Sequence, residues 1–290
     1  MNNLQLFLNV ATEAAIAAEE VLMSYLGRCE AQEKGRPGDL VTQADKASEA
    51  KILQILRTSL PDHAIMTEES GQFGDRHNPY LWVIDPLDGT TNFAHQYPVF
   101  SVSIGLMIHG IPRVGVILDP SQHRLYQAVS GGGAMCNQQP IHVSPTSQLQ
   151  QSLLVTGFAY DRRETPDNNY AEFCYLTHLT QGVRRGGSAA IDLAHIASGR
   201  LDGYWERGLC PWDIVAGIVL VQEAGGVVSA YDGSGVDIQS GRILATNGLI
   251  HSELSQALSQ VKPLSHGSHL VDLLSHSTKI NKHQGMQQNL

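Results

Sequence analysis

The sequence is short of cysteine, of long apolar runs and of basic residues, and each shortage argues against a class of protein. It has four cysteines in 290 residues, none of them in a C-x-x-C pair. That spacing argues against a zinc ribbon and favours free thiols, which a reducing cytoplasm keeps unpaired. The longest strongly apolar run, residues 214–221, is far too short to cross a bilayer. The N-terminus lacks a basic segment followed by an apolar one, so no signal peptide is predicted.

Acidic residues outnumber basic ones by 28 to 19, which gives a formal net charge of -9. This balance argues against a general nucleic-acid binder and against a protein that binds membrane surfaces. Anionic substrates stay open, because bound metal ions reverse the local charge. A hydrophobic content of 42% and a charged content of 16% are typical of a soluble globular protein.

The stretch from 82 to 93, WVIDPLDGTTNF, carries the clearest chemical signal. The apolar residues 80–84 predict a short buried strand that ends at Asp85, because the proline that follows restricts the backbone there. Asp85 and Asp88 are then presented close together, with the Thr90 hydroxyl just beyond. Two such carboxylates repel each other unless a cation or a shared proton lies between them, and oxygen ligands suit Mg²⁺. For an isolated D-P-x-D-G, an Asx turn is the plainer interpretation.

Two further acids lie at the ends of predicted elements. Glu68, the first of two adjacent glutamates, follows a short predicted strand, and Asp213 stands in the first turn of a predicted helix. Each has a plainer interpretation, as a solvated glutamate or as an acid favoured by the helix dipole. Together with Asp85 and Asp88, these acids can hold two or three Mg²⁺ ions about 4 Å apart, the geometry of a two-metal phosphoryl-transfer site.

One more acid and several backbone groups belong to the same hypothesis. Asp45 follows Thr42 at the spacing of a capping box, which gives it a structural role at the start of a helix. The helix N-termini near Thr90 and Ser188 could bind phosphate oxygens through backbone N–H groups. Basic residues are not needed there, because the metal ions supply the positive charge.

The order of the predicted elements indicates an α+β class in two halves. Residues 1–146 begin with a predicted amphipathic helix, which a polar loop follows at 28–41. They continue into an antiparallel meander and contain the first metal-binding motifs. Residues 147–262 alternate strands with helices and complete the metal and substrate site. Residues 263–290 are polar and contain four histidines. They are predicted to be a disordered tail, with a metal-binding tail as the alternative.

Three motifs stand in register over the chain from about residue 5 to residue 262: E-E-S at 68–70, the stretch 82–93, and W-D at 212–213 with E-A-G-G at 223–226. In this order they resemble the inositol monophosphatase family, its bacterial branch above all. The resemblance implies a layered α-β-α-β-α sandwich of the sugar-phosphatase type and a cytoplasmic homodimer. It also implies Mg²⁺-dependent, lithium-sensitive hydrolysis of inositol monophosphate, a small phosphate monoester.

The same resemblance implies a role for each site residue. Two to three Mg²⁺ ions would be held by Glu68, Asp85, the Leu87 carbonyl, Asp88 and Asp213. Asp45 and Thr90 would orient the attacking water, with Glu68 acting through water on the third ion. The substrate would be contacted by Asp88, Gly89, Thr90, the Ala189 backbone, Glu206 and Asp213. Arg184 would support Glu206 or a dimer contact.

Two kinds of alternative stay open. A sister phosphatase of the same fold would act on fructose 1,6-bisphosphate, a 3′-phosphoadenosine compound or histidinol phosphate. A sister enzyme for a bisphosphate favours extra basic residues near the leaving group, and Arg184, Arg185 and Arg207 leave that possibility open. The other alternative is a non-catalytic interaction module that keeps the fold and binds a partner through its surface or its tail.

Overall fold

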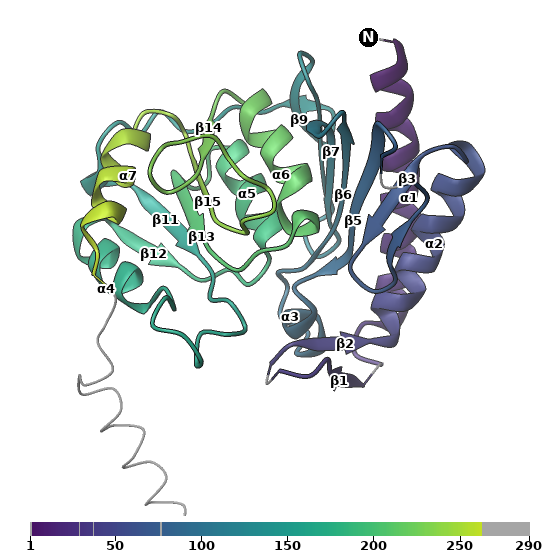
Figure 1. Cartoon of the computed structure of the whole chain (residues 1–290), viewed down its shortest axis with the longest axis horizontal. Helices are drawn as coiled ribbons and strands as arrows, with labels where there is room; N and C mark the ends of the chain where they lie inside the picture. Colours follow the sequence, from purple (N-terminus) through teal and green to yellow (C-terminus); the bar gives the residue numbers. More distant parts are fainter. Residues whose placement is uncertain (1, 29, 37, 76, 263–290) are drawn as a thin grey trace, which may run out of the picture.

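The computed structural model describes residues 2–28, 30–36, 38–75 and 77–262, so the tail predicted at 263–290 lies outside the described residues. Two long helices, α1 (Asn2–Tyr25) and α2 (Gln43–Ser59), pack side by side on one face of a large sheet, on the right in Figure 1. The buried face of α1 is rich in alanine, including Ala11, Ala14 and Ala18. Small side chains there let the two helices approach closely.

The large sheet has eight strands in the order β10-β9-β8-β7-β6-β5-β3-β4. All neighbouring strands are antiparallel except β3 and β5, which run parallel. The strands are β3 (Ala64–Thr67), β4 (Gly71–Phe73), β5 (Tyr80–Asp88), β6 (Ser101–Ile108), β7 (Ile111–Asp119), β8 (Arg124–Val129), β9 (Gly133–Cys136) and β10 (Gln139–Pro140). Strands β6 to β8 form the predicted meander.

The second sheet has five strands in the order β12-β11-β13-β15-β14. They are β11 (Leu153–Thr156), β12 (Gly182–Arg184), β13 (Gly203–Glu206), β14 (Val227–Ser229) and β15 (Ile243–Thr246). The short 3-10 helix η1 (Leu149–Gln151) precedes the sheet. Alternate residues of β13 face opposite layers. Tyr204 packs with the helices between the sheets, and Trp205 packs on the outer side.

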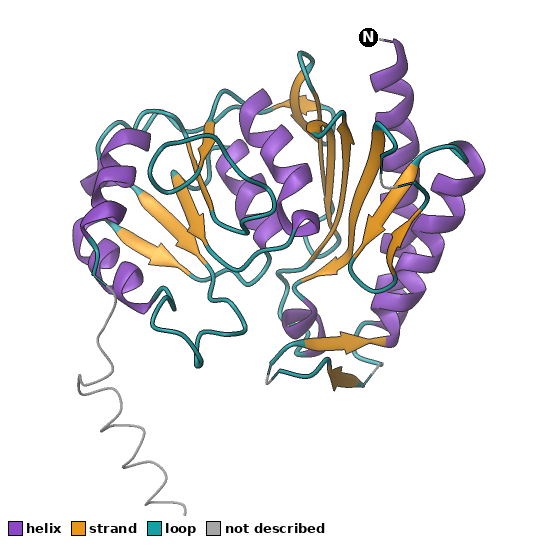
Figure 2. Ribbon diagram, viewed as in Figure 1, coloured by secondary structure: helices purple, strands orange, loops and turns teal. Residues whose placement is uncertain are grey.

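Helices α5 (Ala189–Ala197) and α6 (Pro211–Glu223) lie between the two sheets, while α4 (Tyr170–Leu179) and α7 (His251–Gln260) cover the outer face of the second sheet. Figure 2 shows this succession of helix and strand layers. The glycine pair Gly105 and Gly115, opposite each other on β6 and β7, lets α6 pack tightly. A Cβ on Gly115 would lie 2.3 Å from the Ala216 carbonyl oxygen. The predicted α-β-α-β-α sandwich is confirmed.

One predicted loop is partly ordered into strands. The sequence predicts a polar loop over residues 28–41, whereas β1 (Ala31–Glu33) and β2 (Leu40–Thr42) pair as a small antiparallel sheet. All three residues of β1 are exposed, so this strand has no apolar periodicity by which the sequence could indicate it. Among the described helices, none combines the length and the apolar character that crossing a membrane requires. The division of the chain at residue 146 stays a prediction.

Candidate active site

Strand β5 carries the central motif, and it runs further than the sequence predicts. Rather than ending at Asp85, the strand continues to Asp88. Its pairing with β6 shifts register there: Asp85 lies opposite Ser103, and Asp88 lies opposite Ser101. The extra residue forms a bulge, where the missing N–H of Pro86 is tolerated. Residues three apart in a regular strand point to opposite faces, so the bulge is what lets the two carboxylates converge.

Asp213 reaches the same place from a distant part of the chain. One carboxylate oxygen from each of Asp85, Asp88 and Asp213 lies within 4.8 Å of the other two. Asp213 stands in the first turn of α6, as predicted, and its Oδ2 accepts a hydrogen bond from the Cys210 N–H at 2.6 Å. The position at the helix start therefore fixes the side chain and does not compete with its place in the cluster.

The other two acids are also oriented by hydrogen bonds. Asp88 Oδ2 accepts from the Ser188 hydroxyl at 2.6 Å and from the Ala190 N–H at 2.8 Å, where α5 begins. Asp85 Oδ1 accepts from the Leu87 N–H at 3.0 Å. Because each carboxylate is fixed through one oxygen, the chain can offer the second oxygen to a cation.

Burial and mutual repulsion act strongly on this cluster. Burial raises the pKa of Asp85 well above its ordinary value, and the charges of Glu68, Asp88 and Asp213 raise it further. Burial is also the main cause of the raised pKa of Asp213, followed by the charge of Asp88. Buried acids that repel one another keep protons unless a cation neutralises them. The donor set is oxygen only, so these residues fit a hard divalent cation.

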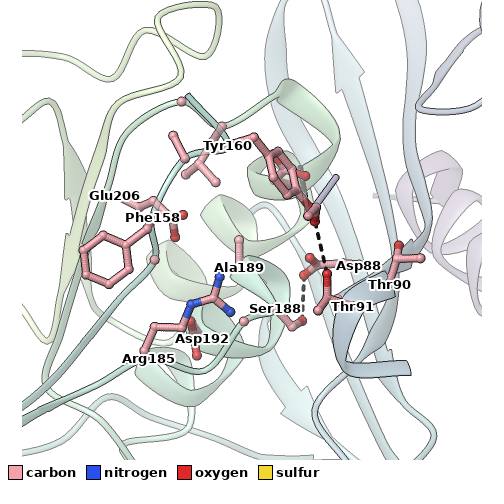
Figure 3. A pocket seen from close by; sticks show the side chains of 18 of the residues that line it. Asp88, Thr90, Thr91, Phe158, Tyr160, Arg185, Ser188, Ala189, Asp192 and Glu206 are labelled. Atoms are coloured by element: carbon pink, nitrogen blue, oxygen red, sulfur yellow. Dashed lines mark hydrogen bonds between the residues drawn. The ribbon is translucent and has the colours of Figure 1, made fainter. Parts of the chain in front are cut away.

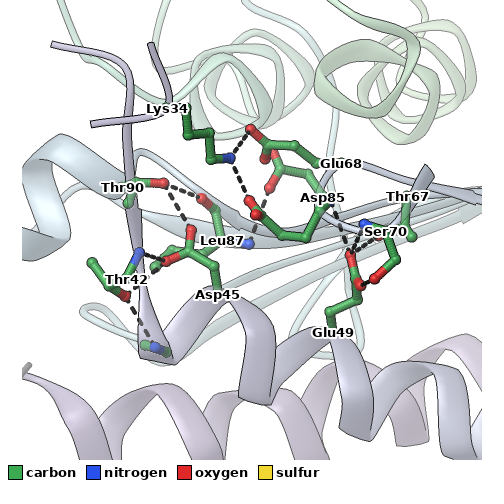
Figure 4. Close-up of polar contacts among 12 residues, drawn as sticks. Lys34, Thr42, Asp45, Glu49, Thr67, Glu68, Ser70, Asp85, Leu87 and Thr90 are labelled. Carbon is green, nitrogen blue, oxygen red and sulfur yellow. Dashed lines mark hydrogen bonds and ion pairs between the residues drawn. The ribbon is translucent and has the colours of Figure 1, made fainter. Parts of the chain in front are cut away.

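Glu68 lies at the edge of the cluster, beside Asp85 (Figure 4). Its Oε1 is 2.8 Å from the Lys34 Nζ, and Lys34 also forms an ion pair with Glu69. Lys34 is part of the connection between β1 and β2 that the sequence had indicated only as loop. Of the four acids predicted to converge, Asp85, Asp88 and Asp213 form the cluster, and Glu68 stands beside it, paired to Lys34.

Asp45 caps α2 and also contacts Thr90, the two neighbours that the sequence suggested for it. The capping box at the start of α2 is formed, and Asp45 Oδ2 accepts from the Thr42 N–H and from the Thr42 hydroxyl, each at 2.7 Å. Its other oxygen is 3.0 Å from the Thr90 hydroxyl, which is also 3.1 Å from the Leu87 carbonyl oxygen. Asp45 is fully buried. The helix cap thus connects directly to the metal-binding motif.

Glu49 is a buried acid one helical turn beyond Asp45, and none of the sequence motifs includes it. Glu49 Oε2 accepts from the Thr67 hydroxyl at 2.6 Å and from the N–H groups of Glu69 and Ser70 at 3.0 and 3.3 Å. Figure 4 shows this carboxylate beneath the turn that carries Glu68. Spacing of four residues places Asp45 and Glu49 on one face of α2, a signal that was available in the sequence.

A cavity of about 210 Å³ opens beside the acids (Figure 3). One wall is formed by Asp88 to Thr91 together with Asp213, and the opposite wall by Glu206 and the start of α5. Six predicted substrate residues line it: Asp88, Gly89, Thr90, Ala189, Glu206 and Asp213. Gly89 has φ 91°, and a Cβ there would lie 2.9 Å from the Val99 carbonyl oxygen, so this turn requires glycine.

Glu206 stands at the end of β13, on the wall of the cavity away from the acid cluster. It is buried, and the Tyr204 hydroxyl donates to its Oε2 at 2.7 Å. Burial raises the pKa of Glu206 to about 7, although the hydrogen bond from Tyr204 and the charge of Arg185 lower it. A Cβ on Gly157 would lie 2.1 Å from Glu206 Oε1, so the carboxylate fills the space that this glycine leaves open.

Of the paired arginines, Arg185 lines the cavity and Arg184 does not. Arg184 is exposed on the edge strand β12, and its predicted supporting role stays a prediction. The charge of Arg185 acts on Asp88, Asp192 and Glu206, and Asp192 is a buried acid that the sequence analysis did not single out. Arg184 is the last residue of β12, and Arg185 lies just beyond the strand end, in the segment that leads to α5.

Residues 3–262 match the model of the inositol monophosphatase family. The chain belongs to the inositol monophosphatase family. A relative from Synechocystis named inositol-1-monophosphatase is 63% identical over 258 residues, which is 89% of this chain and 90% of the relative. The solved structure of inositol monophosphatase from Anabaena superposes with a TM-score of 0.85 at 63% identity, and the match covers 90% of this chain and 98% of that one.

Another branch of this family carries a different name. A Haemophilus influenzae relative named Nus factor SuhB is 40% identical over 258 residues, covering 88% of this chain and 96% of the relative. The predicted family is therefore confirmed, and relatives with two kinds of name match this sequence over nearly their whole length.

Proposed function

We propose that the protein hydrolyses inositol monophosphate to inositol and inorganic phosphate and that it depends on Mg²⁺. The observation that carries this proposal is the meeting of Asp85, Asp88 and Asp213 beside the cavity, in a chain 63% identical to an inositol-1-monophosphatase. Neither the bulge in β5 nor the cap of α6 requires that these three acids face one another. Their convergence is understandable if cations bind between them.

The proposed metal ligands are the residues that the resemblance implied. Asp85 would be shared by two ions, the first also held by Glu68 and the Leu87 carbonyl and the second by Asp88 and Asp213. Glu68 would contact a third ion through water. Bound Mg²⁺ would offset the charge of the phosphate oxygens and make water more acidic. Lys34 lies against Glu68 and adds positive charge at the same edge.

Asp45 and Thr90 are proposed to orient the attacking water. The Thr90 hydroxyl touches Asp45 Oδ1 on one side and the Leu87 carbonyl on the other. A hydroxyl held between two acceptors can donate to one of them while its own lone pairs accept from water. Asp45 is fixed by Thr42, so this pair is held in place before substrate binds.

The two ends of the substrate are proposed to bind opposite walls of the cavity. Gly89 and Thr90, at the N-terminus of α3 (Thr90–Ala94), would contact the phosphate through backbone N–H groups and the hydroxyl. Ala189 and Glu206 would contact the ring hydroxyls from the far wall, where Asp88 and Asp213 also reach. The Tyr204 hydroxyl orients Glu206 for this task. Arg184 is proposed to act outside the cavity, at a contact between subunits of a homodimer.

The direct test is a phosphate-release screen with the purified full chain and a panel of inositol, sugar and nucleotide phosphates. We expect release only with Mg²⁺, inhibition by lithium, and at least a tenfold preference in kcat/KM for inositol 1-phosphate. Fructose 1,6-bisphosphate, a 3′-phosphoadenosine compound and histidinol phosphate test the sister enzymes. The Asp88→Asn variant should release no phosphate, and undiminished activity in this variant would refute the metal site.

The branch named Nus factor SuhB favours a second, non-catalytic role as an interaction module. Asp88→Asn separates the two roles, because it removes a proposed metal ligand without altering the outer surface. If the variant releases no phosphate and still restores the wild-type phenotype to a deletion strain, the chain has the second role. If the variant behaves as the deletion does, the phosphatase accounts for the phenotype. The proposed site of action in both cases is the cytoplasm.

A further inference from the structure

The cavity is covered by a segment that contains none of the predicted site residues. Residues 157–169, which we call the roof, connect β11 to α4 and contribute Gly157, Phe158, Ala159, Tyr160 and Arg162 to the lining. Figure 3 shows Tyr160 on the side of the cavity that carries Asp88 and Thr91, and Phe158 on the side of Glu206. The roof therefore spans both ends of the proposed substrate site.

Tyr160 presents an unused donor to the acid cluster. Its hydroxyl makes no hydrogen bond to any described residue, and 44% of the residue is exposed at the mouth of the cavity. After burial, the charges that most raise the pKa of Tyr160 are those of Asp39, Glu68, Asp88 and Asp213. A phenol keeps its proton at neutral pH and can donate. Glu68, Asp88 and Asp213 are proposed metal ligands beside the phosphate, whereas Glu206 marks the alcohol end.

The roof is held by a salt bridge between Arg207 and Asp161, neither of which is a proposed substrate contact. Arg207 follows Glu206 at the end of β13, and its Nη1 and Nη2 bind the two oxygens of Asp161 at 2.7 and 2.8 Å. Its Nε is 3.4 Å from Asp167 Oδ2. The arginine side chain is only 14% exposed. A planar guanidinium that makes two parallel bonds to one carboxylate fixes orientation as well as distance.

Close backbone packing fixes the roof at the same place. A Cβ on Gly208 would lie 2.5 Å from the Ala159 Cβ, so the roof rests directly on the turn after Arg207. At the far end, the Asn169 amide donates to the Thr156 hydroxyl and the Gly157 carbonyl at 2.8 and 2.7 Å. Tyr160 is thus carried by a segment that is tied down on both sides of it.

We propose that the Tyr160 hydroxyl donates a hydrogen bond to the phosphate group of the bound ester, and that Arg207 is the positioning residue that holds Tyr160 there through Asp161. This inference rests on the proposed phosphatase function. It deepens that function by adding a phosphate donor from the roof, a segment to which the proposed function assigns no contact. Because the phosphate is common to all monoesters, the contact is independent of the leaving group.

The first test compares wild type with Tyr160→Phe, which removes one oxygen and keeps the ring. Isothermal titration of inorganic phosphate into the Mg²⁺-loaded protein should show about ten- to hundredfold weaker binding, as for the loss of a hydrogen bond to a charged group. The value of kcat/KM should fall by a similar factor for inositol 1-phosphate and for glycerol 2-phosphate. Unchanged phosphate affinity, or a loss confined to inositol 1-phosphate, would overturn the proposed contact.

The second test examines Arg207 by a double-mutant cycle. Arg207→Gln should weaken phosphate binding nearly as much as Tyr160→Phe, and the double variant should be little worse than either, because both act through one contact. Arg207→Lys keeps the charge without the two-pronged geometry and should give a partial loss. Additive effects of the two changes would show that Arg207 does not act through Tyr160.

Arg36→Gln is the matched control, because Arg36 pairs with Glu164 of the roof at 3.6 Å while both side chains are more than half exposed. Its removal should leave phosphate affinity unchanged, since an exposed pair constrains little. Failure of the proposed function is distinguishable from failure of this inference. In the first case wild type releases no phosphate from any monoester; in the second, wild type is active and Tyr160→Phe equals it.

Discussion

Asp85, Asp88 and Gly89 reach the site from one strand and the turn after it, whereas the opposite wall is assembled from the roof, β13 and the start of α5. On the phosphate side, a local feature, the bulge in β5, brings Asp85 and Asp88 together, and α6 adds Asp213. On the alcohol side the geometry is built by packing between segments far apart in the chain, such as Gly157 against Glu206. Local motifs can therefore specify the chemistry, and tertiary packing specifies what that chemistry is applied to.

The largest effect should come from breaking the phosphate side. Asp85→Asn removes a ligand proposed to be shared by two ions, so kcat/KM should fall about a thousandfold for every substrate. Without metal the same variant should melt at a higher temperature than wild type, because it relieves the repulsion with Glu68, Asp88 and Asp213.

Thermal melts in Mg²⁺ and in a chelator check this prediction. Wild type should gain stability from Mg²⁺, and Asp85→Asn should gain much less, so that the order of the two melting temperatures reverses. A variant that is less stable than wild type under both conditions would contradict the view that the cluster is strained by its own charge. Asn at a residue outside the cluster, as in Asp62→Asn, serves as the matched control.

On the alcohol side, the clearest expectation concerns pH. The folded-state pKa of Glu206 is about 7, raised above the ordinary value of 4.5 mainly by burial. Between these two values the unfolded chain has lost the proton and the folded chain keeps it, so this group makes the protein less stable as pH rises. Glu206→Gln should remove that loss. Its free energy of unfolding should therefore rise relative to that of wild type by about 3 kcal/mol as the pH goes from 4.5 to 7.

Urea denaturation of the metal-free protein at several pH values measures this difference. The gain should level off above pH 7, where both states of wild type are ionised. A difference between Glu206→Gln and wild type that does not change with pH would mean that the carboxylate is solvated in the folded protein. Glu13→Gln, at an exposed position of α1, provides a control for loss of a glutamate charge.

The same contrast explains how much could be predicted from the sequence. Acids at element ends, the capping box at Thr42 and the start of α6 depend on neighbours in sequence, and they were found from spacing alone. The sequence around Pro86 predicts a strand end where the structure has a bulge, because proline disfavours a strand ladder and a register shift leaves no mark of its own in the sequence. The roles proposed for these residues stay predictions.

Residues on the alcohol side were harder to predict for a physical reason. Arg185, Asp192 and Tyr160 line the cavity only because β12, α5 and the roof pack around it, and no periodicity reports such packing. Gly157 shows this most clearly, since its need for glycine arises from the Glu206 carboxylate, 49 positions away in the chain. Glycines of this kind are recognised only once both segments are placed.

A moderate effect is expected beneath the metal site. Glu49 Oε2 accepts from the Thr67 hydroxyl and the N–H groups of Glu69 and Ser70, and Oε1 accepts from the Ser70 hydroxyl. Glu49→Gln exchanges one of these oxygens for an NH₂ group, so the turn that carries Glu68 should loosen. Supporting residues behind metal ligands change affinity by about ten- to a hundredfold, and we expect that loss for Mg²⁺. Calorimetric titration of Mg²⁺ without substrate checks it. Equal affinity in the variant would show that the turn holds Glu68 unaided.

The smallest expected effect distinguishes the two walls most sharply. In Gly157→Ala the added Cβ would lie 2.1 Å from Glu206 Oε1, so the carboxylate must move while the acid cluster is untouched. The KM for inositol 1-phosphate should rise by about tenfold, as for the loss of one hydrogen bond to a charged group. Glycerol 2-phosphate, whose alcohol is too small to span the cavity, should be hydrolysed nearly as before. If both substrates suffer equally, Gly157 acts on the phosphate side through the roof, and the division between the two walls is wrong.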